Sequence, residues 1–146
     1  MESIYTVDAS VFLNAFNPAE AGHADSRALL EKLQRDQTPI IVPTLLLPEV
    51  AAAIRRGRRN EALAKQFAAT LRRLPHLVFI PLDDNLAARS ADTAAAYRLR
   101  GSDAVYVALA MRFGAALITL DKEQHNRAKP NLQSYYPVEL LSTLLL

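Results

Sequence analysis

Residues 101–121, GSDAVYVALAMRFGAALITLD, contain two structural elements and the turn between them. Ser102 is a good helix N-cap, and the residues after it predict an apolar helix over 104–113 that ends at a glycine. The run at 115–120, apolar except for Thr119, then predicts a buried strand, with Asp121 directly after it. A helix that leads into a buried strand is the repeating unit of a parallel α/β sheet.

The rest of the chain alternates in the same way. We expect strands at residues 3–7, 39–43, 77–82 and near 138–141, and helices at 11–16, 24–33, 60–74 and up to about 98. Polar residues are placed to begin helices: Ser10, Thr44 and Asp83 or Asp84. Gly57 is expected to interrupt the helix that Thr44 begins. This alternation indicates a single three-layer α/β/α domain over residues 1–146, with a central parallel sheet.

The composition fits a compact globular protein. Hydrophobic residues make up 51% of the 146 residues and charged residues 22%, which argues against disorder. The absence of cysteine excludes disulfides and thiolate metal sites, and it favours a cytoplasmic location. We expect no signal peptide, membrane span or membrane partner. No glycine-rich motif of a dinucleotide site or a P-loop is found in the sequence.

Basic residues are concentrated in one part of a chain whose net charge is only +2. Residues 55–73 contain one acid, Glu61, and a run of arginines at the start: Arg55, Arg56, Arg58 and Arg59. Such a stretch suits a protein that holds a polyanion through its phosphates. The alternative is an ordinary solvated helix face.

Four acids that are distant in sequence fall at equivalent positions in the predicted fold. Asp8 and Asp121 each follow an apolar strand, Asp103 lies at a helix start, and Glu49 lies early in the helix after the second strand. In an open parallel sheet these positions meet beyond the carboxyl ends of the strands, where the strand order reverses. Packed carboxylates repel each other, so a divalent cation with hard-oxygen ligands, Mg²⁺ or Mn²⁺, is expected among them.

Several of these residues also have simpler explanations. Asp103 alone can be explained by its favourable interaction with a helix dipole. Ser10 can cap its helix or hold a metal-bound water, and Thr119 and Asn126 can support the site from behind. His125 is expected at the surface, and two tyrosines are expected to pack in the interior: Tyr97 and Tyr106.

Four motifs resemble the PIN-domain nucleases, especially the VapC-type toxins of toxin–antitoxin pairs. They are VDAS at 7–10, LPEV at 47–50, GSDAVYVALA at 101–110 and ALITLD at 116–121. The resemblance spans nearly the whole chain in the order and spacing of the family, and the two later motifs are the specific ones. It implies a three-layer α/β/α ribonuclease that depends on Mg²⁺ or Mn²⁺, often forms a homodimer, and is neutralised by a small antitoxin covering the active site.

By that resemblance the metal-binding and catalytic set is Asp8, Glu49, Asp103 and Asp121. Asp8, Asp103 and Asp121 are expected to hold the principal ion, and Glu49 to complete or bridge a second site. The family often has a further acid near the last motif, for which Glu123 is the nearby candidate and Asn126 the next polar group. The predicted reaction is hydrolysis of RNA phosphodiesters by a metal-activated water, with the arginine run on the RNA backbone.

Three alternatives remain open at this point. A phosphotransfer enzyme with an N-terminal Asp-x-Asp would need a second acid where Ser10 stands. A signalling receiver domain would need paired acids after the first strand, where Ala9 stands, although Lys129 would suit it. The third alternative is a PIN-like module that binds RNA or a partner without cleavage.

Overall fold

The computed structural model describes residues 3–146, and its centre is a sheet in which all paired neighbours run parallel. The strands are β1 (Tyr5–Val7), β2 (Ile40–Pro43), β3 (Leu77–Ile80), β4 (Ala116–Ile118) and β5 (Ser134–Tyr135). Their order is β3-β2-β1-β4-β5. The chain builds outward from β1 on one side and then returns to its other side with β4. The strand order therefore reverses between β1 and β4.

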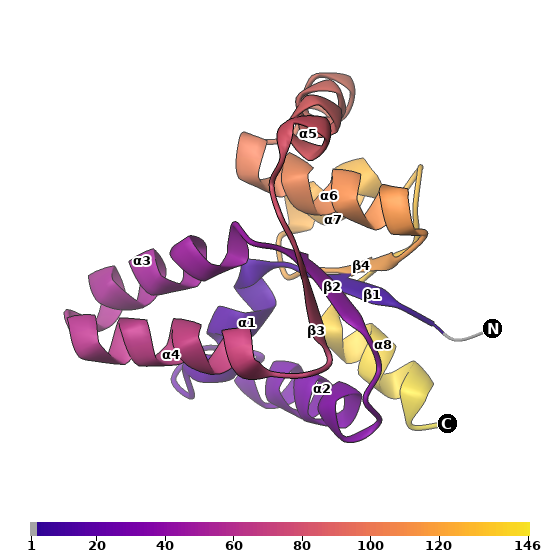
Figure 1. Cartoon of the computed structure of the whole chain (residues 1–146). Coiled ribbons are helices and arrows are strands. Elements are labelled where there is room, and N and C mark those ends of the chain that lie inside the picture. The colour runs from indigo at the N-terminus through magenta and orange to yellow at the C-terminus, as the bar shows by residue number, and fades with distance from the viewer. Residues whose placement is uncertain (1–2) are drawn as a thin grey trace.

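Helices cover both faces of this sheet, which confirms the predicted three-layer α/β/α architecture. They are α1 (Ala9–Phe16), α2 (His23–Arg35), α3 (Leu46–Arg58), α4 (Glu61–Arg73), α5 (Asp84–Tyr97), α6 (Gly101–Phe113), α7 (Lys122–Ala128) and α8 (Pro137–Leu144). Figure 1 shows α5, α6 and α7 on one face, with α1, α2 and α8 on the other. The α3–α4 pair extends to one side of the sheet. Within the described residues, no helix has the length and apolarity needed to cross a bilayer.

The sheet and α6 form the centre of the hydrophobic core. Every residue of β1 and β4 is buried, as expected for parallel strands covered on both faces. All seven residues from Ala104 to Ala110 of α6 are buried as well, so the middle of this helix has no exposed face. It packs on α5 and against β2 and β1. The long apolar run in the sequence is therefore a helix enclosed between other elements.

The C-terminal segment differs from the sequence prediction. The expected strand near residues 138–141 is wrong, because that segment belongs to α8, and the last strand lies earlier, at Ser134–Tyr135. Pro137 stands at the first position of α8, where a missing N–H costs nothing. The Glu139 carboxylate accepts a hydrogen bond from the Tyr136 N–H at 2.8 Å, which closes a capping box.

Two predicted helix boundaries also shift. The helix expected from Thr44 begins at Leu46, and Gly57 does not interrupt it. The helix continues to Arg58 and ends at Arg59, which adopts the left-handed conformation with φ of 51°. Asp83 caps α5 by accepting a hydrogen bond from the Leu86 N–H, as one of the two predicted alternatives. These shifts leave the order of elements unchanged.

Candidate active site

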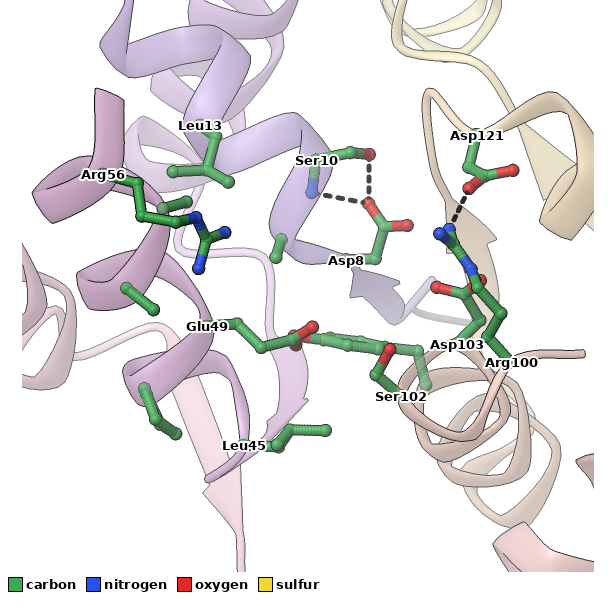
Figure 2. A pocket seen from close by; sticks show the side chains of 15 residues that line it. Asp8, Ser10, Leu13, Leu45, Glu49, Arg56, Arg100, Ser102, Asp103 and Asp121 are labelled. Atoms are coloured by element: carbon green, nitrogen blue, oxygen red, sulfur yellow. Dashed lines mark hydrogen bonds and ion pairs between the residues drawn. The ribbon is translucent and has the colours of Figure 1, made fainter. Parts of the chain in front are cut away.

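A pocket of about 620 Å³ opens where β1 and β4 end, between α1, α3 and α6. All four predicted carboxylates line it, as the close view in Figure 2 shows. The other charged or polar residues in its wall are Ser10, Arg56, Arg100, Ser102 and Tyr106. The structure therefore brings together acids that lie in four different segments of the chain.

Asp8 is the most deeply buried of the four acids, with 4% of its surface exposed. One oxygen accepts hydrogen bonds from the Ser10 N–H at 3.1 Å and from the Ser10 hydroxyl, and the other accepts from the Thr119 hydroxyl at 2.6 Å. Asp8, and not Ser10 as expected, is therefore the N-cap of α1. The Ser10 Oγ in turn accepts from the Leu120 N–H at 3.1 Å, which ties the end of β1 to the end of β4.

Burial raises the pKa of three of these carboxyl groups. The pKa of Asp8 rises to about 6, although the hydrogen bonds from Ser10 and Thr119 act to lower it, and nearby Asp103 raises it further. Burial also raises the pKa of Glu49 and that of Asp103. Burial thus disfavours the charged forms of these three carboxyl groups, and a cation in the pocket would stabilise them.

Glu49 is held by a tyrosine from the opposite wall. The Tyr106 hydroxyl donates to Glu49 Oε1 at 2.6 Å, and the tyrosine is almost completely buried in α6. Tyr106 packs in the core as the sequence predicts, but its hydroxyl also connects α6 to α3 across the pocket. Asp103 lies on α6 one turn before Tyr106, so a single helix supplies one acid and orients another.

Arg100 joins the two remaining acids. Its Nε donates to Asp103 Oδ2 at 3.0 Å, and its Nη2 donates to Asp121 Oδ2 at 2.7 Å (Figure 2). Arg100 also occupies the N-cap position of α6, so the expected capping role of Ser102 is wrong; Ser102 lies in the first turn and lines the pocket. Arg100 was not among the predicted site residues, and the available signal for it was its spacing of three residues from Asp103.

Asp121 has a second structural role. Its Oδ1 accepts a hydrogen bond from the Gln124 N–H at 3.0 Å and so caps α7. The fully buried Gln124 side chain contacts the Thr119 hydroxyl at 3.2 Å and donates to the Asp103 carbonyl at 3.3 Å. Gln124 was also missed, although its place three residues after the cap is the sequence signal of a capping box. Its side chain instead connects the segments that carry three of the acids.

Most of the other predicted supporting residues lie outside this pocket. Of the arginine run, Arg56 lines the pocket, whereas Arg55, Arg58 and Arg59 are not part of its wall. Arg58 instead stacks over the ring of Phe16, with 5.8 Å between the guanidinium carbon and the ring centroid. Asn126 is exposed on α7 and is not in the wall either.

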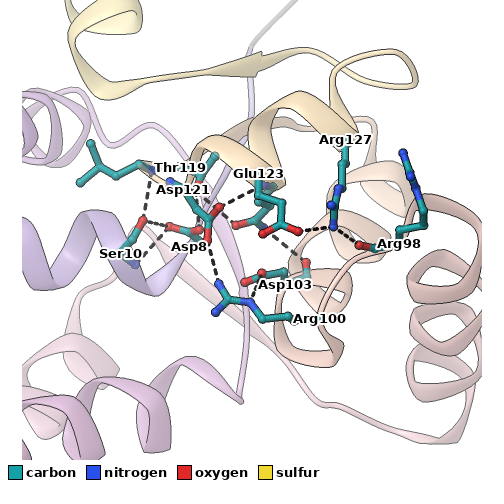
Figure 3. A network of polar contacts seen from close by, with 11 residues as sticks. Asp8, Ser10, Arg98, Arg100, Asp103, Thr119, Asp121, Glu123 and Arg127 are labelled. Carbon is teal, nitrogen blue, oxygen red and sulfur yellow. Dashed lines mark hydrogen bonds and ion pairs between the residues drawn. The ribbon is translucent and has the colours of Figure 1, made fainter.

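The candidate further acid, Glu123, forms an ion pair with Arg127, whose guanidinium also donates to the Arg98 carbonyl (Figure 3). Glu123 is not part of the pocket wall. His125, expected at the surface, is buried: its Nδ1 lies 2.7 Å from the Ser134 Oγ, and its ring stacks on Tyr136 at 4.2 Å between centroids. It anchors α7 to β5, away from the acids.

The donor set of the pocket matches a hard divalent cation in its chemistry, because it consists of carboxylate oxygens. Within residues 3–146, however, no three acidic, histidine or cysteine side chains lie close enough together to hold an ion in their present positions. Asp103 and Asp121 are turned toward the Arg100 guanidinium instead. Asp103 Oδ2 and Asp121 Oδ2, two of the oxygens suited to a hard cation, thus accept hydrogen bonds from Arg100.

The fold and the pocket together define a three-layer α/β/α protein with acids gathered at its topological switch point. The sequence model of the PIN domain matches residues 5–130, so the chain belongs to the PIN-domain family. No curated protein sequence matches the chain significantly.

Solved structures share this fold at low sequence identity. PAE2754 from Pyrobaculum aerophilum is 24% identical with a TM-score of 0.70, over 99% of this chain and 97% of that one. VapC20 of Mycobacterium tuberculosis, a sarcin-ricin loop cleaving toxin, is 18% identical with a TM-score of 0.69, over 89% and 96% of the two chains. A toxin–antitoxin complex from Klebsiella pneumoniae is also 18% identical, with a TM-score of 0.66 over 91% and 97%.

Proposed function

We propose that this PIN-domain protein is a divalent-metal-dependent endoribonuclease and the toxin of a type II toxin–antitoxin pair. The observation that carries the proposal is the pocket at the ends of β1 and β4. It gathers four carboxylates, and burial raises the pKa of three of them. Charged carboxylates in a buried pocket are stable mainly when a cation binds between them. A metal-dependent phosphodiesterase uses such a cation to activate water.

In this proposal Asp8, Asp103 and Asp121 hold the principal Mg²⁺ or Mn²⁺, and Glu49 completes or bridges a second position. The bound metal would supply an activated water and stabilise the leaving oxygen. The protein's own residues prepare the site for it. Ser10 and Thr119 fix the orientation of Asp8 through both of its oxygens, and Tyr106 fixes that of Glu49. Asp8 and Glu49 are thus positioned before a ligand arrives.

Arg56 is the part of the chain best placed to receive RNA. It lines the same pocket from α3, opposite Asp103 and Asp121 (Figure 2). A phosphate that approaches the acids would therefore pass a guanidinium, which pairs well with phosphate oxygens. We infer that the RNA backbone enters along α3 and that Arg56 contacts it directly.

A small antitoxin is the proposed protein partner, and a homodimer the proposed assembly. Support for the antitoxin comes from the similar fold found in the Klebsiella pneumoniae toxin–antitoxin complex. Coexpression of the chain with the product of the adjacent reading frame tests this part of the proposal. We expect the two proteins to purify together and cleavage to be suppressed, and two independently eluting proteins would contradict it.

The second candidate function is binding of RNA or a partner without cleavage. One observation favours it: Arg100 already neutralises two of the four acids through ion pairs at 3.0 and 2.7 Å. If these ion pairs were permanent, the pocket would not take up a metal ion. The two candidates therefore differ in whether a metal ion binds and in whether RNA is cut.

A cleavage assay separates them. We expect the protein to cut a structured RNA in the presence of Mg²⁺ or Mn²⁺, and a chelator to stop the reaction. Asp8→Asn and Asp103→Asn should each lower the rate by at least about a hundredfold, as loss of a metal ligand does. Asp92→Asn, at an exposed acid of α5, is the matched control and should leave the rate unchanged. RNA that is bound but stays intact with both metals would support the binding function instead.

A further inference from the structure

Arg100 occupies the part of the acidic pocket where positive charge is most needed. Its guanidinium bonds to Asp103 and Asp121 at once, at 3.0 and 2.7 Å, and so bridges α6 and the start of α7. The two carboxylate side chains are 18% and 25% exposed, whereas the arginine side chain is 70% exposed. A largely solvated cation therefore neutralises two acids that are themselves mostly buried.

The bonds to Arg100 use oxygens that a metal ion would need. Both oxygens of Asp121 are engaged, since Oδ1 caps α7 while Oδ2 accepts from Arg100. Releasing Oδ1 would remove the N-cap of α7, so Oδ2 is the oxygen that changes partners at the lower cost. On Asp103, the bond from the Arg100 Nε engages Oδ2. Arg100 and a divalent ion thus compete for Asp121 Oδ2, and the same guanidinium also lies on the Asp103 carboxylate.

Little else holds the guanidinium in place. Among the described residues, its side-chain hydrogen bonds are the two to Asp103 and Asp121. Arg100 lies at the N-cap of α6, and its side chain can swing into solvent without disturbing the core. Exposed ion pairs contribute little stability because water screens them, so a doubly charged ion can displace a singly charged one.

We propose that Arg100 is a built-in counter-ion, which neutralises the acidic pocket of the metal-free protein and is displaced when a divalent cation binds. The inference rests on the proposed metal site and adds a regulatory feature to it. The arginine keeps Asp103 and Asp121 from repelling each other before the metal arrives. It also lowers the affinity of the pocket for metal, so the site fills only when the ion is abundant enough to compete.

Two variants separate competition at these atoms from a general effect of charge. Arg100→Gln removes the competitor, and Arg100→Lys keeps the positive charge but loses the planar fork that reaches both carboxylates. Arg56→Gln is the matched control, because Arg56 lines the same pocket without an ion pair to these acids within the described residues. A purely electrostatic effect would make Arg56→Gln resemble Arg100→Gln and leave Arg100→Lys like the unmodified protein.

The first measurement is calorimetric titration of each protein with Mn²⁺ at constant pH and ionic strength. We expect Arg100→Gln to bind Mn²⁺ about three- to tenfold more tightly, as loss of two partly exposed ion pairs implies. The Mn²⁺ affinity of Arg100→Lys should lie between those of Arg100→Gln and the unmodified protein. Arg56→Gln should change the affinity by less than about twofold. Unchanged or weaker binding by Arg100→Gln, or an equal gain in Arg56→Gln, would overturn the inference.

The second measurement is the melting temperature with a chelator and with saturating Mn²⁺. In chelator, Arg100→Gln should melt below the unmodified protein, because the acids then repel each other without a counter-ion. Saturating Mn²⁺ should remove this difference in melting temperature. A difference that persists would mean that Arg100 has only a structural role. Absence of Mn²⁺ binding in every protein would overturn the proposed function itself. Binding that is equal in all of them would overturn this inference alone.

Discussion

At the scale of single residues, Asp8 shows how burial and hydrogen bonding act in opposite directions on one carboxyl group. Desolvation disfavours its charged form, while the Ser10 and Thr119 donors favour it. Desolvation is the larger effect, and the pKa rises from 3.8 to about 6. The folded protein therefore holds a proton on Asp8 over a range of pH in which the unfolded chain has lost it.

This imbalance predicts how Asp8→Asn changes stability with pH. Because the pKa of Asp8 is higher in the folded state, its contribution to stability falls as pH rises from 3.8 to about 6. In chelator at about pH 7.5, the neutral amide should raise the free energy of unfolding by on the order of 2–3 kcal/mol. Below about pH 4 both side chains are neutral, and the gain should be small. Urea denaturation at the two pH values measures the difference, and an equal or larger gain at low pH would contradict it.

At the scale of elements, α3 shows that one unfavourable residue does not decide where a helix ends. Gly57 predicted a break, but the helix continues because Leu46, Val50 and Ile54 form a buried stripe along it. A helical glycine costs only about 1 kcal/mol relative to alanine, which is less than the stripe contributes by burial. The helix ends instead at Arg59, two residues later.

Two glycines at different places in helices should therefore respond oppositely to alanine. A Cβ added at Gly57 meets no atom within 4 Å, and its backbone is helical, so Gly57→Ala should stabilise the protein by about 0.5–1 kcal/mol. Gly114 ends α6 with φ of +63°, a conformation that strains any side chain, so Gly114→Ala should destabilise it by about 1 kcal/mol. Chemical denaturation of both variants tests this. Changes in the free energy of unfolding that have the same sign in both variants would contradict the helical conformation of Gly57 or the left-handed one of Gly114.

At the scale of the whole molecule, the distribution of charge separates into an acidic pocket and a basic region beside it. The pocket wall carries the four acids, and α3 carries Arg56 into the same wall. The remaining arginines of α3 and α4 lie outside the pocket wall, where they can add long-range attraction to the direct contact that we propose for Arg56. Such long-range attraction speeds association and is screened by salt, whereas a direct phosphate contact also releases a counterion.

The salt dependence of RNA binding should identify the direct contact. Arg56→Gln should weaken binding of a single-stranded RNA and reduce the slope of log K against log salt by about 0.7, the value for one lost phosphate contact. The measurement uses fluorescence anisotropy in chelator, so that no RNA is cut. Arg73→Gln, at an exposed arginine of α4, should leave the slope nearly unchanged. Equal slopes for Arg56→Gln and the unmodified protein would place the RNA elsewhere.

Local sequence patterns were sufficient for most elements and insufficient at the C-terminus. Residues 101–121 predicted a helix, a glycine turn and a strand, and all three are present. The segment VELL at 138–141 predicted a strand, because four residues with three apolar side chains are too short to show a clear periodicity. The Pro137–Glu139 capping pattern was the better signal, and it marks the start of α8. Burial of His125 had no signal in its neighbours, because Ser134 and Tyr136 reach it from another element.

The amino-acid sequence by itself determined the alternation of strands and helices and the placement of Asp8 and Asp121 after strands, because both follow from nearest neighbours and backbone periodicity. Only the tertiary structure decided which side chains form hydrogen bonds to the acids of the pocket. Thr119 reaches Asp8 across 111 residues, Tyr106 reaches Glu49 across 57, and Arg100 reaches Asp121 across 21. Such partners depend on how distant segments pack and which rotamers that packing allows, and no local pattern encodes them.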